Sequence, residues 1–155
     1  MANPLQMLPL VTTGFQFIQE TAVSAPPAKV WSAVINPGKW FFFNPDPTTH
    51  AKHTFELKPG GQWISESKNG NSALMATVLL IEPGTLLRLS GPIGLSHLPL
   101  ATVVIFELQP QNDGKTTLLR VGMRSCGFMD VEVENRYKGA WQRLLPQLKA
   151  AAEAA

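Results

Sequence analysis

The sequence predicts an α+β domain in which a curved, seven-stranded antiparallel sheet wraps around a long C-terminal helix, with two short helices after the first strand. Turn-forming pairs recur at even intervals through the middle of the chain. The segments between them are rich in β-branched and aliphatic residues, and the final segment changes from a two-residue to a helical hydrophobic period. We expect a single domain over residues 15–155, preceded by an N-terminal extension over residues 1–14.

Four turn signals separate the expected strands. They are Pro59-Gly60-Gly61, Asn69-Gly70, Pro83-Gly84 and Asp113-Gly114. Such pairs favour turns because glycine adopts positive φ and proline presets its own φ. Short strands joined by hairpin turns are typical of an antiparallel meander. The expected strands are 15–23, 53–58, 62–68, 73–82, 85–90, 101–109 and 116–125.

Alternation in the last two expected strands separates an apolar face from a polar one. The polar face carries Glu107, Arg120 and Arg124, which we expect to form cross-strand charge pairs. Since the other face is apolar, another element must cover it. That face carries Val104, Phe106, Leu108, Leu119, Val121 and Met123.

The covering element is the C-terminal helix, expected from Asp130 to about Ala154. Asp130 is suited to the N-cap or first turn because its carboxylate interacts favourably with the helix dipole. Pro146 removes one helical hydrogen bond, so we expect a kink or a break between Gln142 and Pro146. The apolar stripe of this helix comprises Val133, Tyr137, Trp141, Leu144 and Leu148.

Two short helices are expected between the first two strands. Ser24 or Ala25 lies near the cap of the first, because Pro26-Pro27 is tolerated in a first helical turn. Asn36-Pro37-Gly38 ends this helix. An aromatic segment over residues 40–43 follows it and ends at Asn44-Pro45.

Charge and composition exclude several classes of protein. The net charge is only +2 and there is no Lys/Arg run, which argues against nucleic-acid binding. Residues 1–14 lack the cationic start of a signal peptide, and no apolar run is long enough to cross a bilayer. We therefore expect a cytoplasmic protein without stable membrane insertion. The single cysteine, Cys126, is expected to be a small buried apolar residue.

Three segments carry a resemblance to a known family. Residues 25–31 (APPAKVW) look like the start of its first helix, residues 55–63 (FELKPGGQW) resemble its strand-turn-strand signature, and residues 81–87 with 126–128 resemble its later strands. In this order they resemble the START-related, birch-pollen-allergen-like (SRPBCC) superfamily over about residues 15–150. The nearest likeness is to the heat-shock-protein-90 ATPase activator-like branch and the adjoining polyketide cyclase/dehydrase branch. The resemblance implies a helix-grip fold.

The resemblance also implies a ligand cavity between the sheet and the last helix, where aromatic and apolar side chains would form the wall. Tyr137 and Trp141 lie one helical turn apart, and each carries one polar atom on an otherwise apolar body. The alternative for each residue is a solidly packed core. The expected ligand-binding residues are Trp40, Phe42, Phe55, Trp63, Phe106, Met123, Tyr137 and Trp141.

The segment Gly91–Leu100 is apolar but contains two glycines and two prolines, so it is not a regular strand throughout. Three roles are open for it: closing over a pocket mouth, packing against a second subunit, or covering the core of its own domain. A homodimer therefore stays open.

No catalytic constellation or cofactor motif is recognisable. His50 and His53 invite a metal site, but no third ligand accompanies them, and we expect neither a metal nor a cofactor. The leading function is binding of a small hydrophobic molecule, such as a lipid, sterol-like or polyketide-like compound. One alternative is a polyketide cyclase/dehydrase-type enzyme, with Tyr137 and His53 as acid–base candidates. The other is a chaperone-activator-like interaction module.

Overall fold

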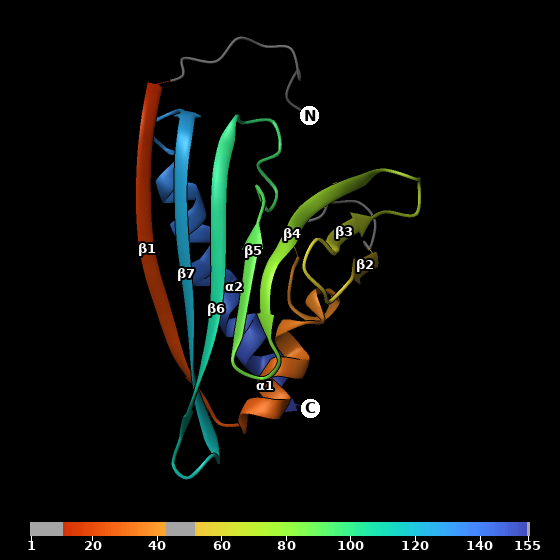
Figure 1. The fold of residues 1–155 in the computed structure, drawn as a ribbon, viewed down its shortest axis with the longest axis vertical. Helices are drawn as coiled ribbons and strands as arrows, with labels where there is room; N and C mark the ends of the chain where they lie inside the picture. Colours follow the sequence, from red (N-terminus) through yellow and green to blue (C-terminus); the bar gives the residue numbers. More distant parts are fainter. Residues whose placement is uncertain (1–10, 43–51, 155) are drawn as a thin grey trace.

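The seven expected strands form one antiparallel sheet in the computed structural model, which describes residues 11–42 and 52–154. The strand order across the sheet is β1-β7-β6-β5-β4-β3-β2, so every strand from β2 to β7 pairs with its neighbour in the sequence (Figure 1). The elements are β1 Val11–Val23, α1 Pro27–Val34, the 3-10 turn η1 Pro37–Lys39, β2 Lys52–Phe55, β3 Gln62–Glu66, β4 Ser72–Glu82, β5 Leu86–Ser90, β6 Leu100–Gln111, β7 Thr116–Met129 and α2 Val133–Ala154.

The long helix α2 runs behind the sheet and covers its inner face, and α1 packs beside it near the C-terminus (Figure 1). This is the α+β helix-grip arrangement that the sequence predicts. The inner faces of β6 and β7 carry the expected residues, all buried: Val104, Phe106, Leu108, Leu119, Val121 and Met123. The apolar face of the sheet and the stripe of α2 thus form one core.

The strands β1 and β7 are longer than their hydrophobic patterns predict. β1 and β7 pair continuously from Val11 opposite Met129 to Val23 opposite Thr117. Polar and glycine residues at the strand ends weaken the alternation but keep their backbone hydrogen bonds to a neighbouring strand. Backbone pairing therefore extends the sheet beyond the residues whose hydrophobic alternation predicts a strand.

The turn Pro59-Gly60-Gly61 requires glycine for two separate reasons. Gly60 has a φ of +80°, in the left-handed region. A Cβ at Gly61 would lie 2.0 Å from the carbonyl oxygen of Glu56, so no side chain fits there. This turn fixes the connection between β2 and β3.

The helix α2 is continuous through Pro146, so the expectation of a broken helix is wrong. Pro146 is exposed, whereas Leu144, Leu145 and Leu148 beside it are buried. Packing of these leucines on the core outweighs the loss of one hydrogen bond. Before the helix, Asp130 Oδ1 accepts a hydrogen bond from the Glu132 N–H at 2.9 Å, so Asp130 stabilises the turn that leads into α2.

The first short helix, α1, begins at Pro27, with proline in its first turn as expected. The second is the single 3-10 turn η1, which precedes the aromatic segment. After it the backbone is not helical at Trp40, whose indole Nε1 donates to the carbonyl oxygen of Ala33 at 2.9 Å. This bond holds the Trp40 ring in the core. Phe43 and Pro45 lie outside the described residues.

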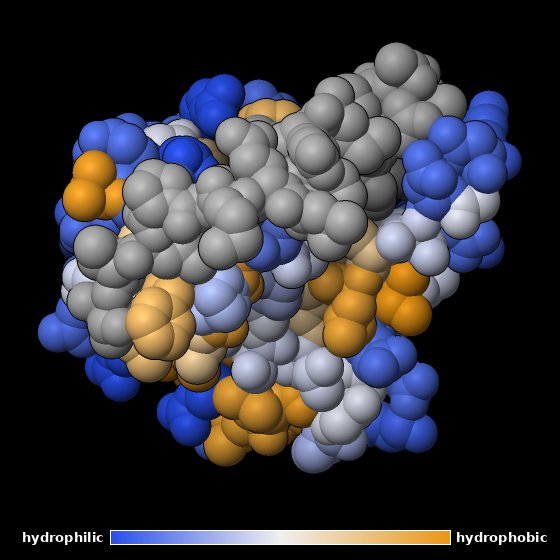
Figure 2. Space-filling view, turned by 90° about the horizontal axis from the view of Figure 1, so that it is seen from above, coloured by the Kyte–Doolittle hydropathy of each residue, from blue (hydrophilic) through white to orange (hydrophobic). Residues whose placement is uncertain are grey.

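The Gly91–Leu100 segment covers the core of its own domain. Ile93 and Leu98 are buried, and the Ile93 N–H donates to the Met75 carbonyl at 3.1 Å. The Tyr137 hydroxyl of α2 donates to the carbonyl oxygen of Pro92. At this end of the molecule, viewed from above Figure 1, hydrophobic residues are exposed among hydrophilic ones (Figure 2).

Cys126 is exposed, so the expectation of a buried cysteine is wrong. In β7, alternate side chains point outward, and Cys126 is one of these, together with Arg124 and Phe128, while Ser125 points inward. Among the described residues, no helix is long and apolar enough to span a membrane.

Candidate functional site

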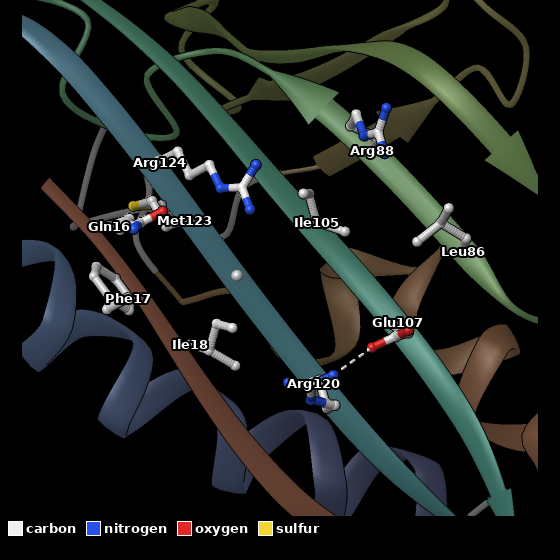
Figure 3. Close-up of a pocket in the computed structure, with 11 residues that line it drawn as sticks. Gln16, Phe17, Ile18, Leu86, Arg88, Ile105, Glu107, Arg120, Met123 and Arg124 are labelled. Carbon is white, nitrogen blue, oxygen red and sulfur yellow. Dashed lines mark hydrogen bonds and ion pairs between the residues drawn. The ribbon is translucent and has the colours of Figure 1, made fainter.

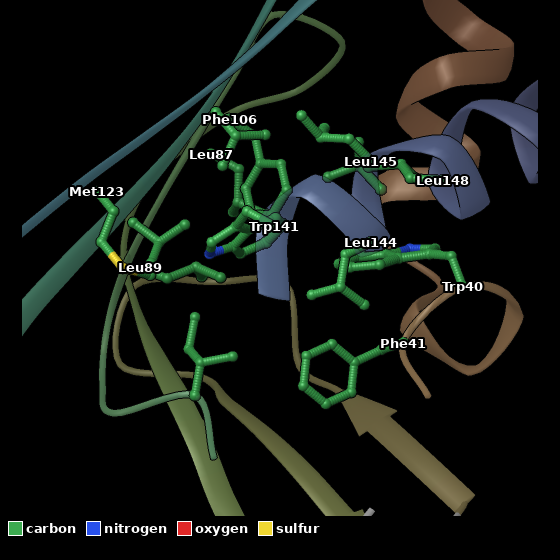
Figure 4. Packing of buried hydrophobic residues seen from close by; sticks show 14 of the residues in the cluster. Trp40, Phe41, Leu87, Leu89, Phe106, Met123, Trp141, Leu144, Leu145 and Leu148 are labelled. Carbon is green, nitrogen blue, oxygen red and sulfur yellow. The ribbon is translucent and has the colours of Figure 1, made fainter. Parts of the chain in front are cut away.

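An aromatic cluster lies between α2 and the inner face of the sheet (Figure 4). Trp40 lies at its centre, with ring-centroid distances of 6.3 Å to Trp63, 6.2 Å to Phe106 and 6.1 Å to Trp141. Phe41 meets Trp63 edge-on at 5.0 Å. The rings are tilted or perpendicular to one another, which is the favourable geometry for aromatic pairs. This interior therefore combines large apolar surfaces from the segment after η1 and from β3, β6 and α2.

The structure brings most of the predicted ligand-binding residues together in this interior. Phe55 is partly buried and stacks on Trp63 at 5.7 Å, whereas Phe42 is 45% exposed. Phe41, which the sequence analysis did not select, takes a place in the cluster. The predicted residues that are buried are Trp40, Trp63, Phe106, Met123, Tyr137 and Trp141.

The indole N–H groups show how the cluster is held. Trp63 Nε1 donates to His53 Nδ1 at 3.0 Å, and Trp40 Nε1 donates to Ala33. Hydrogen bonds thus fix two of the three tryptophans in the cluster.

His53 is the half-buried polar group of this interior. Its ring lies 5.8 Å from Phe41 and 6.0 Å from Trp63. Because Nδ1 accepts the Trp63 N–H, the proton of the neutral imidazole resides on Nε2. Burial lowers the pKa of His53, so the neutral form is favoured in the fold.

Ser65 lies beside His53 and was missed by the sequence analysis. The two residues are register partners on β3 and β2. Ser65 is fully buried, and its hydroxyl has no hydrogen-bond partner among the described residues. Alternation from Trp63 would have placed Ser65 on the inner face, but only the three-dimensional structure reveals that it is unpaired.

Tyr137 belongs to a different polar group from His53. Its hydroxyl donates to Pro92 and interacts with the Thr102 hydroxyl, which lies 2.8 Å from Ser125 Oγ. Burial raises the pKa of Tyr137 to about 12. Its ring contacts Phe15 at 6.0 Å. The two acid–base candidates are therefore engaged by separate partners.

The outer face of the sheet carries a hollow of about 690 Å³ (Figure 3). Gly122 forms its floor because it has no side chain, and Ile18 and Ile105 are its register partners on β1 and β6. Arg88 and Arg124 border the hollow. It is an open groove with charged edges, unlike the enclosed apolar pockets that hold hydrophobic ligands.

Arg120, at one end of this hollow, forms the charge pairs that the sequence predicts. Its guanidinium lies 2.9 Å from a carboxylate oxygen of Glu107 and 3.3 Å from one of Glu20. These residues are directly opposite one another on β6, β7 and β1.

Among the described residues, no group of three His, Cys, Asp or Glu side chains could hold a metal ion. His50, the other member of the candidate metal pair, lies outside the described residues.

The family model described as activator of Hsp90 ATPase homolog 1-like protein matches residues 24–153. This chain belongs to the Hsp90-ATPase-activator-like family. The match spans α1, η1, the strands β2 to β7 and α2 up to residue 153, but not β1, and it confirms the resemblance found in the sequence. No curated protein matches the chain.

Solved bacterial structures share the fold of this member of the Hsp90-ATPase-activator-like family. An uncharacterised protein from Rhizobium leguminosarum has a TM-score of 0.71 at 15% identity, covering 96% of this chain and 100% of that one. A protein from Mesorhizobium loti has a TM-score of 0.65 at 23% identity, covering 91% and 98%. One from Chromobacterium violaceum has a TM-score of 0.61 at 22% identity, covering 89% and 96%. At these identities the likeness shows the fold alone.

Proposed function

We propose that this member of the Hsp90-ATPase-activator-like family binds a small hydrophobic molecule between the sheet and α2. The observation that carries the proposal is the aromatic cluster of Trp40, Trp63 and Trp141, in which large rings from β3, α2 and the segment after η1 meet on the inner face of the sheet. Aromatic walls with a few polar atoms are typical of sites for lipid-like or polyketide-like compounds.

The route into this interior would pass the segments that border it. The Gly91–Leu100 segment is attached to α2 by the Tyr137–Pro92 hydrogen bond and to β4 by the Ile93–Met75 bond. Release of residues 91–99, which precede β6, would open the end of the core near Tyr137 without breaking a strand of the sheet. Loops commonly take this role beside a rigid scaffold.

The enzyme alternative, a cyclase or dehydrase, gains no support from the two candidate groups. The Tyr137 phenol, with a pKa of about 12, is a weak acid at neutral pH and already donates its hydrogen to Pro92. His53 uses Nδ1 to accept the Trp63 N–H. The interaction-module alternative rests on the family name, and no described surface feature favours it.

Native mass spectrometry, with organic extraction of copurifying molecules, tests the proposed function. We expect a discrete bound mass that denaturation releases. A clean unliganded mass, with no thermal stabilisation by a panel of lipids and polyketide-like compounds, would overturn the proposal.

A variant of the outer face provides the matched control. Gly122→Leu fills the outer hollow, and it fits there because a Cβ at this position meets only Ile18, at 3.9 Å. An interior ligand remains bound to this variant. Loss of the bound mass in Gly122→Leu would place the ligand on the outer face and contradict the proposal.

A further inference from the structure

The buried hydroxyl of Ser65 is an exception in this protein. Other buried serine and threonine side chains of the described residues have partners: Thr102 bonds with Ser125, Thr117 donates to the Ala25 carbonyl at 2.8 Å, and Ser67 bonds with Asn69. Ser65 Oγ has none. Native proteins satisfy nearly all buried polar groups, and an unpaired one destabilises the fold.

The position of Ser65 places its hydroxyl next to the aromatic cluster. Ser65 follows Trp63 by two residues on β3, so both side chains lie on the inner face. Across the sheet, Ser65 is opposite His53 on β2 and Ala73 on β4. Ala73 is apolar, and His53 Nδ1 already accepts the Trp63 N–H. Neither residue therefore accepts a hydrogen bond from the Ser65 hydroxyl.

The surroundings of Ser65 are electrically neutral. No charged side chain is buried among the described residues, and His53 is held in its neutral form by burial and by the Trp63 hydrogen bond. A carboxylate or phosphate entering this interior would lose its hydration without gaining a cation. An uncharged oxygen acceptor would meet no such cost.

We propose that Ser65 is a ligand-recognition residue, which donates its hydrogen bond to an uncharged carbonyl or hydroxyl oxygen on an otherwise apolar ligand. This inference rests on the proposed interior site and specifies the chemistry of its ligand. Without the ligand, the hydroxyl is buried and unpaired. With the ligand bound, the Ser65 hydroxyl has an acceptor. The hydrogen bond then favours ligands that carry an oxygen at this position over ligands that do not.

Three naphthalene probes of similar shape test this chemistry. 2-Acetylnaphthalene carries a ketone, 2-naphthoate carries an anionic carboxylate, and 2-isopropylnaphthalene carries only carbon at the same position. Titration followed by tryptophan fluorescence or calorimetry gives the three affinities. We expect the ketone to bind about three- to tenfold more tightly than the hydrocarbon, as one neutral hydrogen bond allows, and the carboxylate to bind most weakly.

The variant Ser65→Ala separates recognition from structure. We expect it to lower the affinity for the ketone to that of the hydrocarbon and to leave the hydrocarbon affinity unchanged. In the free protein we expect its Tm to equal or exceed that of the wild type, because the substitution removes an unpaired buried hydroxyl. A purely structural role for Ser65 would lower the Tm.

Ser67→Ala is the matched control, since Ser67 is a buried serine directly after β3 and its hydroxyl is bonded to Asn69. We expect a lower Tm and an unchanged preference for the ketone. Equal loss of ketone preference in both serine variants would overturn the role of Ser65, as would a wild type that binds ketone and hydrocarbon alike or prefers the carboxylate. If none of the probes binds and no molecule copurifies, the interior site itself is rejected.

Discussion

The hydrogen bond between Trp63 and His53 links the protonation of one side chain to the packing of another. Nδ1 of His53 accepts the indole N–H at 3.0 Å, and burial lowers the pKa of His53. Protonation would convert this acceptor into a donor and would place two N–H groups against each other. The folded protein therefore resists protonation of His53.

This resistance predicts a loss of stability in acid. Because the folded pKa lies below the unfolded value, near 6.5, the unfolded chain binds more protons at lower pH. The free energy of unfolding contributed by His53 is complete above about pH 6.5 and decreases as the pH falls toward the folded pKa. Thermal unfolding between pH 7.5 and 5 should show a steeper fall in Tm for the wild type than for His53→Gln.

His97 supplies the control for this prediction because its side chain is exposed in the Gly91–Leu100 segment. His97→Gln should retain the acid-induced fall of the wild type. Parallel pH profiles for the wild type and His53→Gln would show that the Trp63–His53 bond has no such effect.

At the scale of elements, Arg120 connects three neighbouring strands. It bridges Glu20 on β1 and Glu107 on β6, and these side chains are about half exposed. Exposed ion pairs contribute little individually, and salt screens them. We expect Arg120→Met to lower the free energy of unfolding by about 0.5–1 kcal/mol at low ionic strength and by less in 1 M salt.

Urea unfolding at two salt concentrations measures this effect, with Arg124→Met as the matched control on the same face of β7. No ion pair of Arg124 is found among the described residues. A loss for Arg120→Met that is the same at both salt concentrations would indicate lost side-chain packing in place of charge pairing.

The helix α2 carries its own destabilising residue. Pro146 is exposed within the helix and cannot donate a backbone hydrogen bond. Pro146→Ala restores that donor and removes the ring clash, partly offset by a more flexible unfolded chain. We expect the free energy of unfolding to rise by about 1–2 kcal/mol.

Denaturant unfolding checks the Pro146 prediction, with Gln147→Ala, a change at the next exposed position, as the control. The control should change stability only slightly. An unchanged or lower stability of Pro146→Ala would mean that α2 is shaped around the proline ring and needs it.

At the scale of the whole molecule, local signals predicted the fold well because each element carries its own pattern. The turn pairs set the strand boundaries, and the alternation around Phe106 and Val121 assigned the inner face correctly. Of the kink or break expected near Pro146, the break was wrong, because the packing of neighbouring leucines keeps α2 continuous. The expected burial of Cys126 was also wrong, because its position in β7 points its side chain outward.

The candidate site was predicted less completely than the fold. The helical stripe identified Trp141, and the cavity implied by the family resemblance added Trp40 and Trp63 as wall residues; the structure joins the three in one cluster. The pairing of His53 with Trp63 and the unpaired hydroxyl of Ser65 depend on strand register and on what every neighbour already binds. No single segment of the sequence contains that information.

The tryptophan indoles offer the most direct test of the central claim, an interior ligand site. The chain has four tryptophans, so a ¹H–¹⁵N spectrum resolves four indole N–H signals, which single Trp→Phe variants assign. On titration with 2-acetylnaphthalene, the account predicts that the signals of Trp40, Trp63 and Trp141 shift together while Trp31 on α1 changes little. Unmoved indole signals, with shifts confined to the backbone amide of Gly122 and its outer-face neighbours, would contradict it.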